Sequence, residues 1–141
     1  MKLTAKGRYA VTAVAALAAR GAGARVSLRE LSEEQGISLT FLEQLFARLR
    51  RAGIVESARG KSGGYSLSWA ASDVTVGQII RAVDETVRAQ GCTPDMKTAC
   101  TGKGARCLTH DLWHALESHI GDFLSSVTIA DVVEGKVGEM A

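Results

Sequence analysis

Residues 27–53 read SLRELSEEQGISLTFLEQLFARLRRAG, and this stretch decides the fold. Ser27, followed three positions later by a glutamate, has the spacing of a capping box, which predicts a short helix over residues 28–35. Gly36 ends that helix in a tight turn, and a second helix is predicted over residues 39–52. Two helices joined through a glycine turn are the pattern of a helix-turn-helix unit.

The second of these helices has two different faces. Apolar side chains recur at the i, i+3, i+4 and i+7 spacing, which predicts one buried face. They are Leu42, Leu45, Phe46 and Leu49. The opposite face is polar and basic, and we expect it to enter the major groove of DNA. The candidate DNA-binding residues of this helix and its cap are Ser38, Thr40, Glu43, Gln44, Arg48 and Arg51.

Each of these side chains has a chemistry suited to DNA. Gln44 can pair with an adenine edge, and Glu43 can accept from cytosine N4 while repelling phosphates and base acceptors. The hydroxyl groups at positions 38 and 40 can donate to phosphates or bases. Arg48 and Arg51 are expected to neutralise phosphates, with a solvated helix face as the alternative.

A β-hairpin is predicted directly after the second helix. The short strands 54–57 and 65–68 flank the segment ARGKSGG, residues 58–64. Its three glycines and two basic residues predict a flexible, cationic tip. A helix-turn-helix followed by a basic hairpin is the winged helix-turn-helix pattern. The candidate DNA-binding residues of the hairpin are Arg59, Gly60 and Lys61.

Further helices are predicted on both sides of this unit. An alanine-rich helix is expected over residues 8–20, and another over residues 75–85. A long amphipathic helix starts at residue 108, and a short capped helix over 128–133 precedes an end, 135–141, that we expect to fray. The predicted fold is mainly α with a small β-hairpin, a winged helix-turn-helix plus a long dimerisation helix.

The long helix carries an apolar stripe that is too wide for an exposed helix. The stripe consists of Leu112, Leu116, Ile120 and Leu124, broadened by Trp113 and Phe123. We expect this face to pack on a second copy of the chain. Packing against the helix's own domain is the alternative.

Charge is divided unevenly along the chain. Residues 1–65 carry eleven Lys and Arg against five Asp and Glu, whereas residues 66–141 carry six against ten. A basic first half suits a nucleic-acid reader and an acidic second half a sensing and pairing region, with chance variation on solvated surfaces as the alternative. The apolar run 11–19 is too short to span a bilayer, so we expect a cytoplasmic protein without a membrane partner.

All three cysteines lie in the stretch GCTPDMKTACTGKGARCLTH, residues 91–110. Cys92, Cys100 and Cys107 supply three thiolates, and His110 follows the last of them at Cys-x-x-His spacing. Three thiolates and one imidazole are a complete ligand set for a metal ion or a two-iron cluster. A soft-metal site beside a DNA reader predicts a sensor.

Other functions compete with this interpretation. Cys107, His110 and His114 have the Cys-x2-His-x3-His spacing of a zinc site, although the wide cysteine gaps do not resemble those of zinc fingers. A metal-free thiol switch is a further alternative. An electron carrier would explain a cluster but leaves the basic half without a purpose. The sequence offers no nucleophile–base pairing and no glycine-rich nucleotide loop, so an enzyme is not predicted.

Six motifs extend over essentially the whole chain. They are KLTAKGRYAVTA (2–13), QGISLTFLEQLFARLR (35–50), RGKSGGYSL (59–67), VGQIIRAVDE (76–85), CLTHDLW (107–113) and FLSSVTIADVV (123–133). Together they resemble the IscR family of bacterial iron–sulfur cluster regulators. The resemblance implies a homodimeric winged-helix transcription factor that binds palindrome-like operators on double-stranded DNA and controls iron–sulfur cluster assembly genes.

The resemblance also implies a cofactor and its ligands. It implies a [2Fe–2S] cluster, supplied by the iron–sulfur cluster assembly machinery and held by Cys92, Cys100, Cys107 and His110. The cysteine gaps, Cys-x7-Cys-x6-Cys, are a little longer than in the best-known relatives. Arg59 resembles the family's minor-groove arginine, which suits narrow grooves of high negative potential.

On this interpretation the chain has three parts. A winged helix-turn-helix DNA-binding domain covers residues 1–87, a cluster-binding loop 88–107, and a dimerisation helix with the C-terminal segment 108–141. We expect the cluster-loaded dimer to bind its cluster-dependent operators and the apo form a narrower set. The hypothesis is that cluster binding repositions the reading helix or Glu43 relative to DNA.

Overall fold

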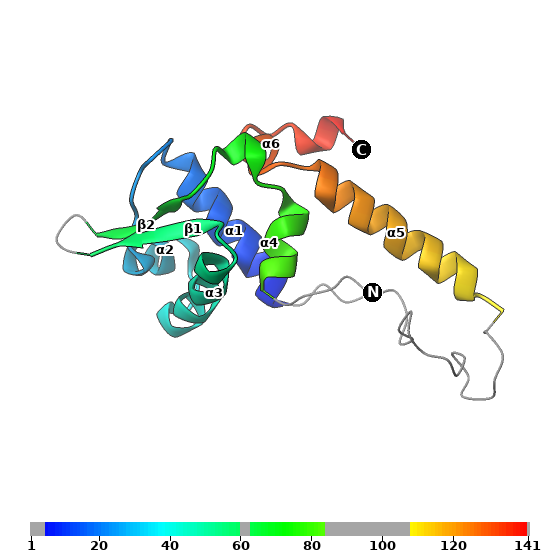
Figure 1. Ribbon diagram of the computed structural model, residues 1–141, viewed down its shortest axis with the longest axis horizontal. Coiled ribbons are helices and arrows are strands. Elements are labelled where there is room, and N and C mark those ends of the chain that lie inside the picture. Colours follow the sequence, from blue (N-terminus) through cyan, green and yellow to red (C-terminus); the bar gives the residue numbers. More distant parts are fainter. Residues whose placement is uncertain (1–4, 60–62, 84–107, 141) are drawn as a thin grey trace.

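The computed structural model describes residues 5–59, 63–83 and 108–140 of the chain. Most of its helices and both strands pack together into one unit, which is called the head below. A single long helix extends away from the head (Figure 1). The head consists of helices and one antiparallel two-stranded hairpin, so the fold is mainly α, as predicted. No helix in these three ranges is long and apolar enough to cross a membrane.

The predicted helix-turn-helix is present with nearly the predicted bounds. α2 covers Leu28–Gln35 and α3 covers Leu39–Arg51, with Ala52 as its C-cap. Gly36 between them has a φ of 65°, a left-handed conformation that glycine adopts without steric cost, and its N–H donates to the Ser32 carbonyl. These bounds could be predicted because caps and hydrophobic spacing act over a few neighbouring residues.

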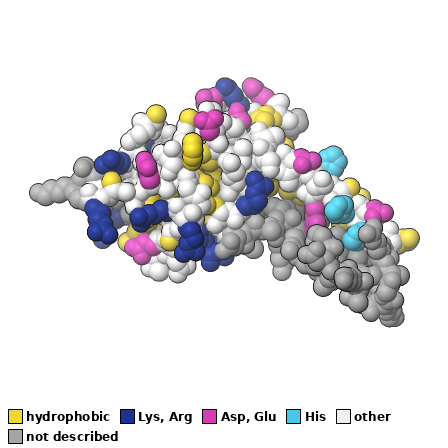
Figure 2. All heavy atoms as spheres, in the orientation of Figure 1, with side chains coloured by type: hydrophobic (Ala, Val, Ile, Leu, Met, Phe, Trp, Pro, Cys, Tyr) yellow, Lys and Arg dark blue, Asp and Glu magenta, His cyan; other side chains and the backbone are white. Residues whose placement is uncertain are grey.

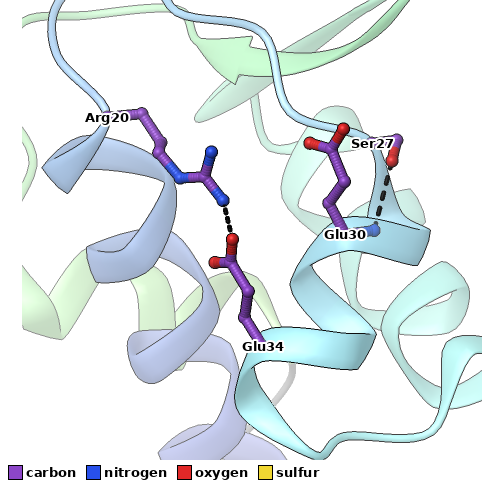
Figure 3. Close-up of polar contacts among 4 residues, drawn as sticks. All are labelled: Arg20, Ser27, Glu30 and Glu34. Carbon is purple, nitrogen blue, oxygen red and sulfur yellow. Dashed lines mark hydrogen bonds and ion pairs between the residues drawn. The ribbon is translucent and has the colours of Figure 1, made fainter.

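The start of α2 differs in one detail from the prediction (Figure 3). The Ser27 hydroxyl accepts from the Glu30 N–H at 3.2 Å, as an N-cap should. The Glu30 carboxylate, which is also among the described residues, does not accept from the Ser27 N–H. The capping box is therefore only half formed. Arg20, the residue after α1, forms an ion pair with Glu34, and the Glu30 charge also acts on the Arg20 guanidinium.

The first helix, α1, runs through the middle of the head. It covers Ala5–Ala19 and begins three residues earlier than predicted. It packs against α2, α3, α4 (Val76–Ala82) and α6 (Ile129–Val133). Small side chains on its buried face let these neighbours approach closely, which explains its alanine-rich sequence. The residues of that face are Gly7, Ala10, Ala13, Val14 and Leu17.

Both strands of the hairpin lie one residue closer to its tip than predicted. β1 covers Val55–Ala58 and β2 covers Gly64–Leu67, and the two strands pair antiparallel. Tyr65 exchanges two backbone hydrogen bonds with Val26, which lies in the segment before α2. This bridge is a contact between residues far apart in the sequence, so a reading of local patterns could not find it.

The elements after the hairpin close the head. A 3-10 helix, η1, covers Ala71–Asp73, and α4 ends at Ala82 rather than near residue 85 as predicted. Val127 and Ile129, on the far side of the long helix, are buried in the same core as α1. The final segment is not frayed as predicted, because it forms the 3-10 helix η2 (Val137–Glu139) and packs Val137 against that core.

The long helix, α5, covers His110–Ser126 and leaves the head at its C-terminal end (Figure 1). None of its residues, all of which the structure describes, is buried in the single chain. Leu112 is 58% exposed, Leu116 38% and Phe123 40%. Only the end near Leu124 packs on the core. Within the described residues, the stripe therefore packs against its own domain at Leu124, while Leu112, Leu116 and Phe123 remain exposed.

Candidate nucleic-acid interface

α3 presents one buried and one exposed face, and the exposed face carries the predicted DNA-binding side chains. Phe46 and its apolar neighbours on the inner face are at most 1% exposed. Thr40, Glu43, Gln44 and Arg51 are all exposed on the outer side, as the helical period requires. Their backbone is fixed by core packing, so the outer face is a rigid surface with free polar groups.

The two remaining α3 candidates have structural partners. The Ser38 hydroxyl accepts from the Phe41 N–H at 3.4 Å and so caps the helix, which leaves its own hydrogen available as a donor. Arg48 is half-buried and engaged in further contacts. Arg50, which sequence reasoning did not select, is exposed in the last turn of α3 beside Arg51.

The hairpin is attached to α3 at its base. Tyr65 of β2 packs edge-to-face on Phe46 of α3, with ring centroids 5.0 Å apart. Arg59 follows β1 directly and is exposed. Gly60 and Lys61, the other two candidates of the hairpin, lie outside the described residues. The structure thus places Arg59 on the same rigid unit as the outer face of α3.

The first turns of α1 add residues that sequence reasoning missed. Tyr9 is 43% exposed and packs edge-to-face on Phe41 of α3, with ring centroids 5.8 Å apart. Arg8 beside it is also exposed. An exposed aromatic residue within a basic, alanine-rich start was the available signal in the sequence. The start of α1, next to the start of α3, is therefore a further candidate part of the interface.

Basic side chains collect on this side of the molecule. Lys and Arg gather over the end of the head that carries α2, α3 and the hairpin, as Figure 2 shows. All three histidines lie on α5, away from that end. A positive surface around a protruding helix attracts the phosphate backbone at long range.

The metal-site candidates are only partly described. His110 is the first residue of α5 and is half-buried, and its ring is stacked parallel to that of His114 at 6.2 Å between centroids. Cys92, Cys100 and Cys107 lie outside the described residues. Within 5–59, 63–83 and 108–140, no three His, Cys, Asp or Glu side chains come close enough to hold a metal ion. The donor chemistry, three thiolates and one imidazole, fits an iron–sulfur cluster.

Three features define a DNA-binding protein of the winged-helix class. They are the recognition helix α3 with one buried and one polar face, the short helix α2 before it, and the β1–β2 hairpin as the wing. The profile of the Rrf2 family, described as iron-dependent transcriptional regulators, matches residues 3–135. The chain belongs to this family of transcription regulators.

The relatives include proteins named HTH-type transcriptional regulator IscR. The one from Photobacterium profundum is 52% identical over 133 residues, which are 94% of this chain and 76% of that protein. The one from Vibrio atlanticus is 51% identical over 134 residues, 95% of this chain and 76% of that protein. The predicted resemblance to the IscR family is therefore confirmed.

Two solved structures have the same fold. IscR of T. potens superposes with a TM-score of 0.76 at 35% identity, covering 96% of this chain and 88% of that one. CymR, the global cysteine regulator of B. subtilis, superposes with a TM-score of 0.79 at 29% identity, covering 95% and 97%. The same fold is thus found both in an IscR protein and in a global cysteine regulator.

Proposed function

We propose that this chain is a homodimeric transcription regulator, not an enzyme, that senses iron–sulfur cluster supply and controls the genes of iron–sulfur cluster assembly. The exposed polar face of α3 beside Arg59, carried on one rigid head, is the observation on which the proposal chiefly depends. The identity to proteins named IscR over 94% of the chain supports the sensing part.

In the proposed DNA complex, α3 lies in the major groove. Gln44 reads an adenine edge and Glu43 selects cytosine by accepting from its N4 group. Arg48 and Arg51 neutralise phosphates, and Arg59 enters the minor groove. The other proposed contacts come from Ser38, Thr40, Gly60 and Lys61. The target is a palindrome-like operator with half-sites about one turn, ~34 Å, apart.

The proposed cluster ligands are Cys92, Cys100, Cys107 and His110. When bound, a [2Fe–2S] cluster supplies a redox-active iron centre whose potential is raised by a histidine ligand. His110 would supply a ring nitrogen as the fourth donor beside the three thiolates. Its position at the start of α5 joins the ligand set directly to the helix that leads to the DNA-binding head.

The proposed division of the chain has a DNA-binding domain over 1–87, a cluster-binding loop over 88–107 and a dimerisation and C-terminal part over 108–141. The exposed apolar stripe of α5 supports the dimer, because an uncovered apolar helix face of this length is unfavourable in water. In the proposed dimer the two copies of α5 cover each other. The cluster assembly machinery is the proposed cluster donor.

The decisive experiment begins with anaerobic purification, an absorption spectrum, and iron and sulfide assays. Operators are then selected from random DNA by the loaded protein and by a Cys92→Ala variant. We expect bound iron and sulfide in the wild type and different operator preferences for the two forms. A loaded protein and a variant with identical preferences would contradict the proposed switch.

One observation favours a zinc site as a second candidate. The parallel rings of His110 and His114 lie one helical turn apart, as in helices that offer two imidazoles to one metal ion. A zinc regulator would be colourless and would contain zinc but neither iron nor sulfide. The same purification therefore separates the two candidates.

A further inference from the structure

α4 and α5 touch at a glycine. Gly77 in the first turn of α4 is buried against Ser125 in the last turn of α5. A Cβ atom at position 77 would lie 2.9 Å from the Ser125 Oγ atom and 3.3 Å from its Cα and N atoms. Contacts to backbone atoms this short require the neighbouring helix to move by a few tenths of an ångström. A side chain at position 77 would therefore require Ser125 and its backbone to shift.

Backbone hydrogen bonds hold the segments on either side of this contact. The Val76 N–H donates to the Val127 carbonyl at 2.9 Å, and the Ile129 N–H donates to the Val74 carbonyl at 2.8 Å. These bonds prevent the base of α5 from sliding along α4. A group inserted at position 77 is therefore expected to change the angle between the helices rather than their register.

Among the described residues, α5 packs on the core of the head at its C-terminal end, near Leu124. It has 17 residues, a length of about 25 Å, and none of them is buried in the single chain. On the other side of the joint between Gly77 and Ser125, α4 shares its core with α1 and α3. The contact between Gly77 and Ser125 therefore lies between α5 and the part of the head that carries the recognition helix α3.

We propose that Gly77 determines the spacing between the two half-sites of the operator. The inference rests on the proposed function, in which two chains pair through α5. In such a dimer the distance between the two α3 helices depends on how α5 packs on its copy and on the angle at each joint. A small rotation at the joint is amplified along α5 and doubled by the two-fold symmetry, whereas one base pair is only about 3.4 Å of DNA length.

The test compares two Gly→Ala changes in full-length, cluster-loaded protein. Gly77→Ala inserts a methyl group at the joint. Gly121→Ala inserts the same group one turn before Ser125 on α5, where no atom lies within 4 Å, and serves as the matched control. Each protein is titrated with palindromes whose half-sites are separated by zero to four base pairs more or fewer than the wild-type optimum, and dimer mass and helix content are measured alongside.

We expect the spacing preferred by Gly77→Ala to change by at least one base pair, while Gly121→Ala keeps the wild-type preference. An unchanged preference in Gly77→Ala, or an equal loss of affinity at every spacing, overturns the inference. If Gly77→Ala does not fold, the double variant Gly77→Ala, Ser125→Ala is compared with Ser125→Ala under the same criteria. Wild-type protein that binds no two-half-site DNA overturns the proposed function as well, and this failure is recognised without any variant.

Discussion

The ring of Tyr65 in the hairpin packs at 70° on the ring of Phe46 in α3, with centroids 5.0 Å apart. Phe46 is fully buried, so this pair connects the base of the wing to the centre of the head. Edge-to-face aromatic pairs of this kind contribute about 0.5–1.5 kcal/mol beyond the area they bury. The wing and the recognition helix are thereby held in one orientation before DNA is present.

Arg59 at the end of β1 is expected to contribute affinity mainly by neutralising charge. We predict that Arg59→Ala weakens operator binding and lowers the slope of log affinity against log salt by about one unit. Anisotropy titrations over a range of KCl concentrations measure both. Lys136→Ala, which removes a cation ion-paired with Glu134 instead, is the control and should leave the slope unchanged. Equal slopes for Arg59→Ala and wild type would remove Arg59 from the interface.

Two residues on the outer face of α3 are expected to act differently. Gln44→Ala should cost about 1–3 kcal/mol at one base position and relax the choice of base there. Arg51→Ala should weaken binding to all sequences alike, because phosphate contacts carry no base information. Operator libraries with every base at each position measure this difference. A uniform effect of Gln44→Ala would contradict its role as a base reader.

The wing depends on a glycine where its backbone meets the segment before α2. At position 64, φ is 143° and a Cβ atom would lie 2.8 Å from the backbone C and O atoms of Val26. We predict that Gly64→Ala lowers the free energy of unfolding by more than about 1 kcal/mol. Gly121→Ala, in an open helical position, should raise it by up to about 1 kcal/mol. Urea denaturation decides, and a Gly64→Ala protein as stable as wild type would refute the steric argument.

The apolar stripe of α5 predicts the oligomeric state. Leu116 lies on the stripe and is 38% exposed in the single chain. Leu116→Glu should convert the proposed dimer to a monomer, because a buried carboxylate in an apolar interface lacks a partner. Ser118→Glu, on the other side of the helix, is the control. Sedimentation equilibrium gives the mass, and a Leu116→Glu dimer would show that the copies pair elsewhere.

Asp131 links the cap of α6 to pH. Its Oδ2 atom accepts from the Thr128 N–H at 3.0 Å, and this bond, followed by that to the Thr128 hydroxyl, holds the pKa of Asp131 below its usual value. A lowered pKa in the folded state stabilises the fold above the unfolded pKa of about 3.9, and the contribution is lost as pH falls through the lower folded value. Below about pH 4, wild type should therefore lose stability that Asp131→Asn never had. The free energies of unfolding of wild type and Asp131→Asn are measured by urea denaturation from pH 7 downward. A difference between the two proteins that stays constant over this range would contradict the prediction.

Predictions from the sequence were most accurate where the signals are local. The ends of α2 and α3 follow from Ser27, Gly36 and Ser38, whose side chains or conformations act on bonds within four residues. The outer face of α3 follows from helical period alone. The predicted hairpin strands, 54–57 and 65–68, had the observed pairing register, although each lies one residue farther from the tip than β1 and β2 do. The bridge between Val26 and Tyr65 joins distant segments, so local patterns could not predict it.

The sequence by itself determined the winged helix-turn-helix, its polar reading face and the cysteine and histidine donors proposed to hold a cluster. Only the tertiary structure decided that Tyr9 meets Phe41, that Val137 packs on the core, and that Gly77 lies against Ser125. Caps and periodicity are set by neighbours along the chain. Contacts between remote segments depend instead on how whole helices share one core, and no local pattern of residues specifies that arrangement.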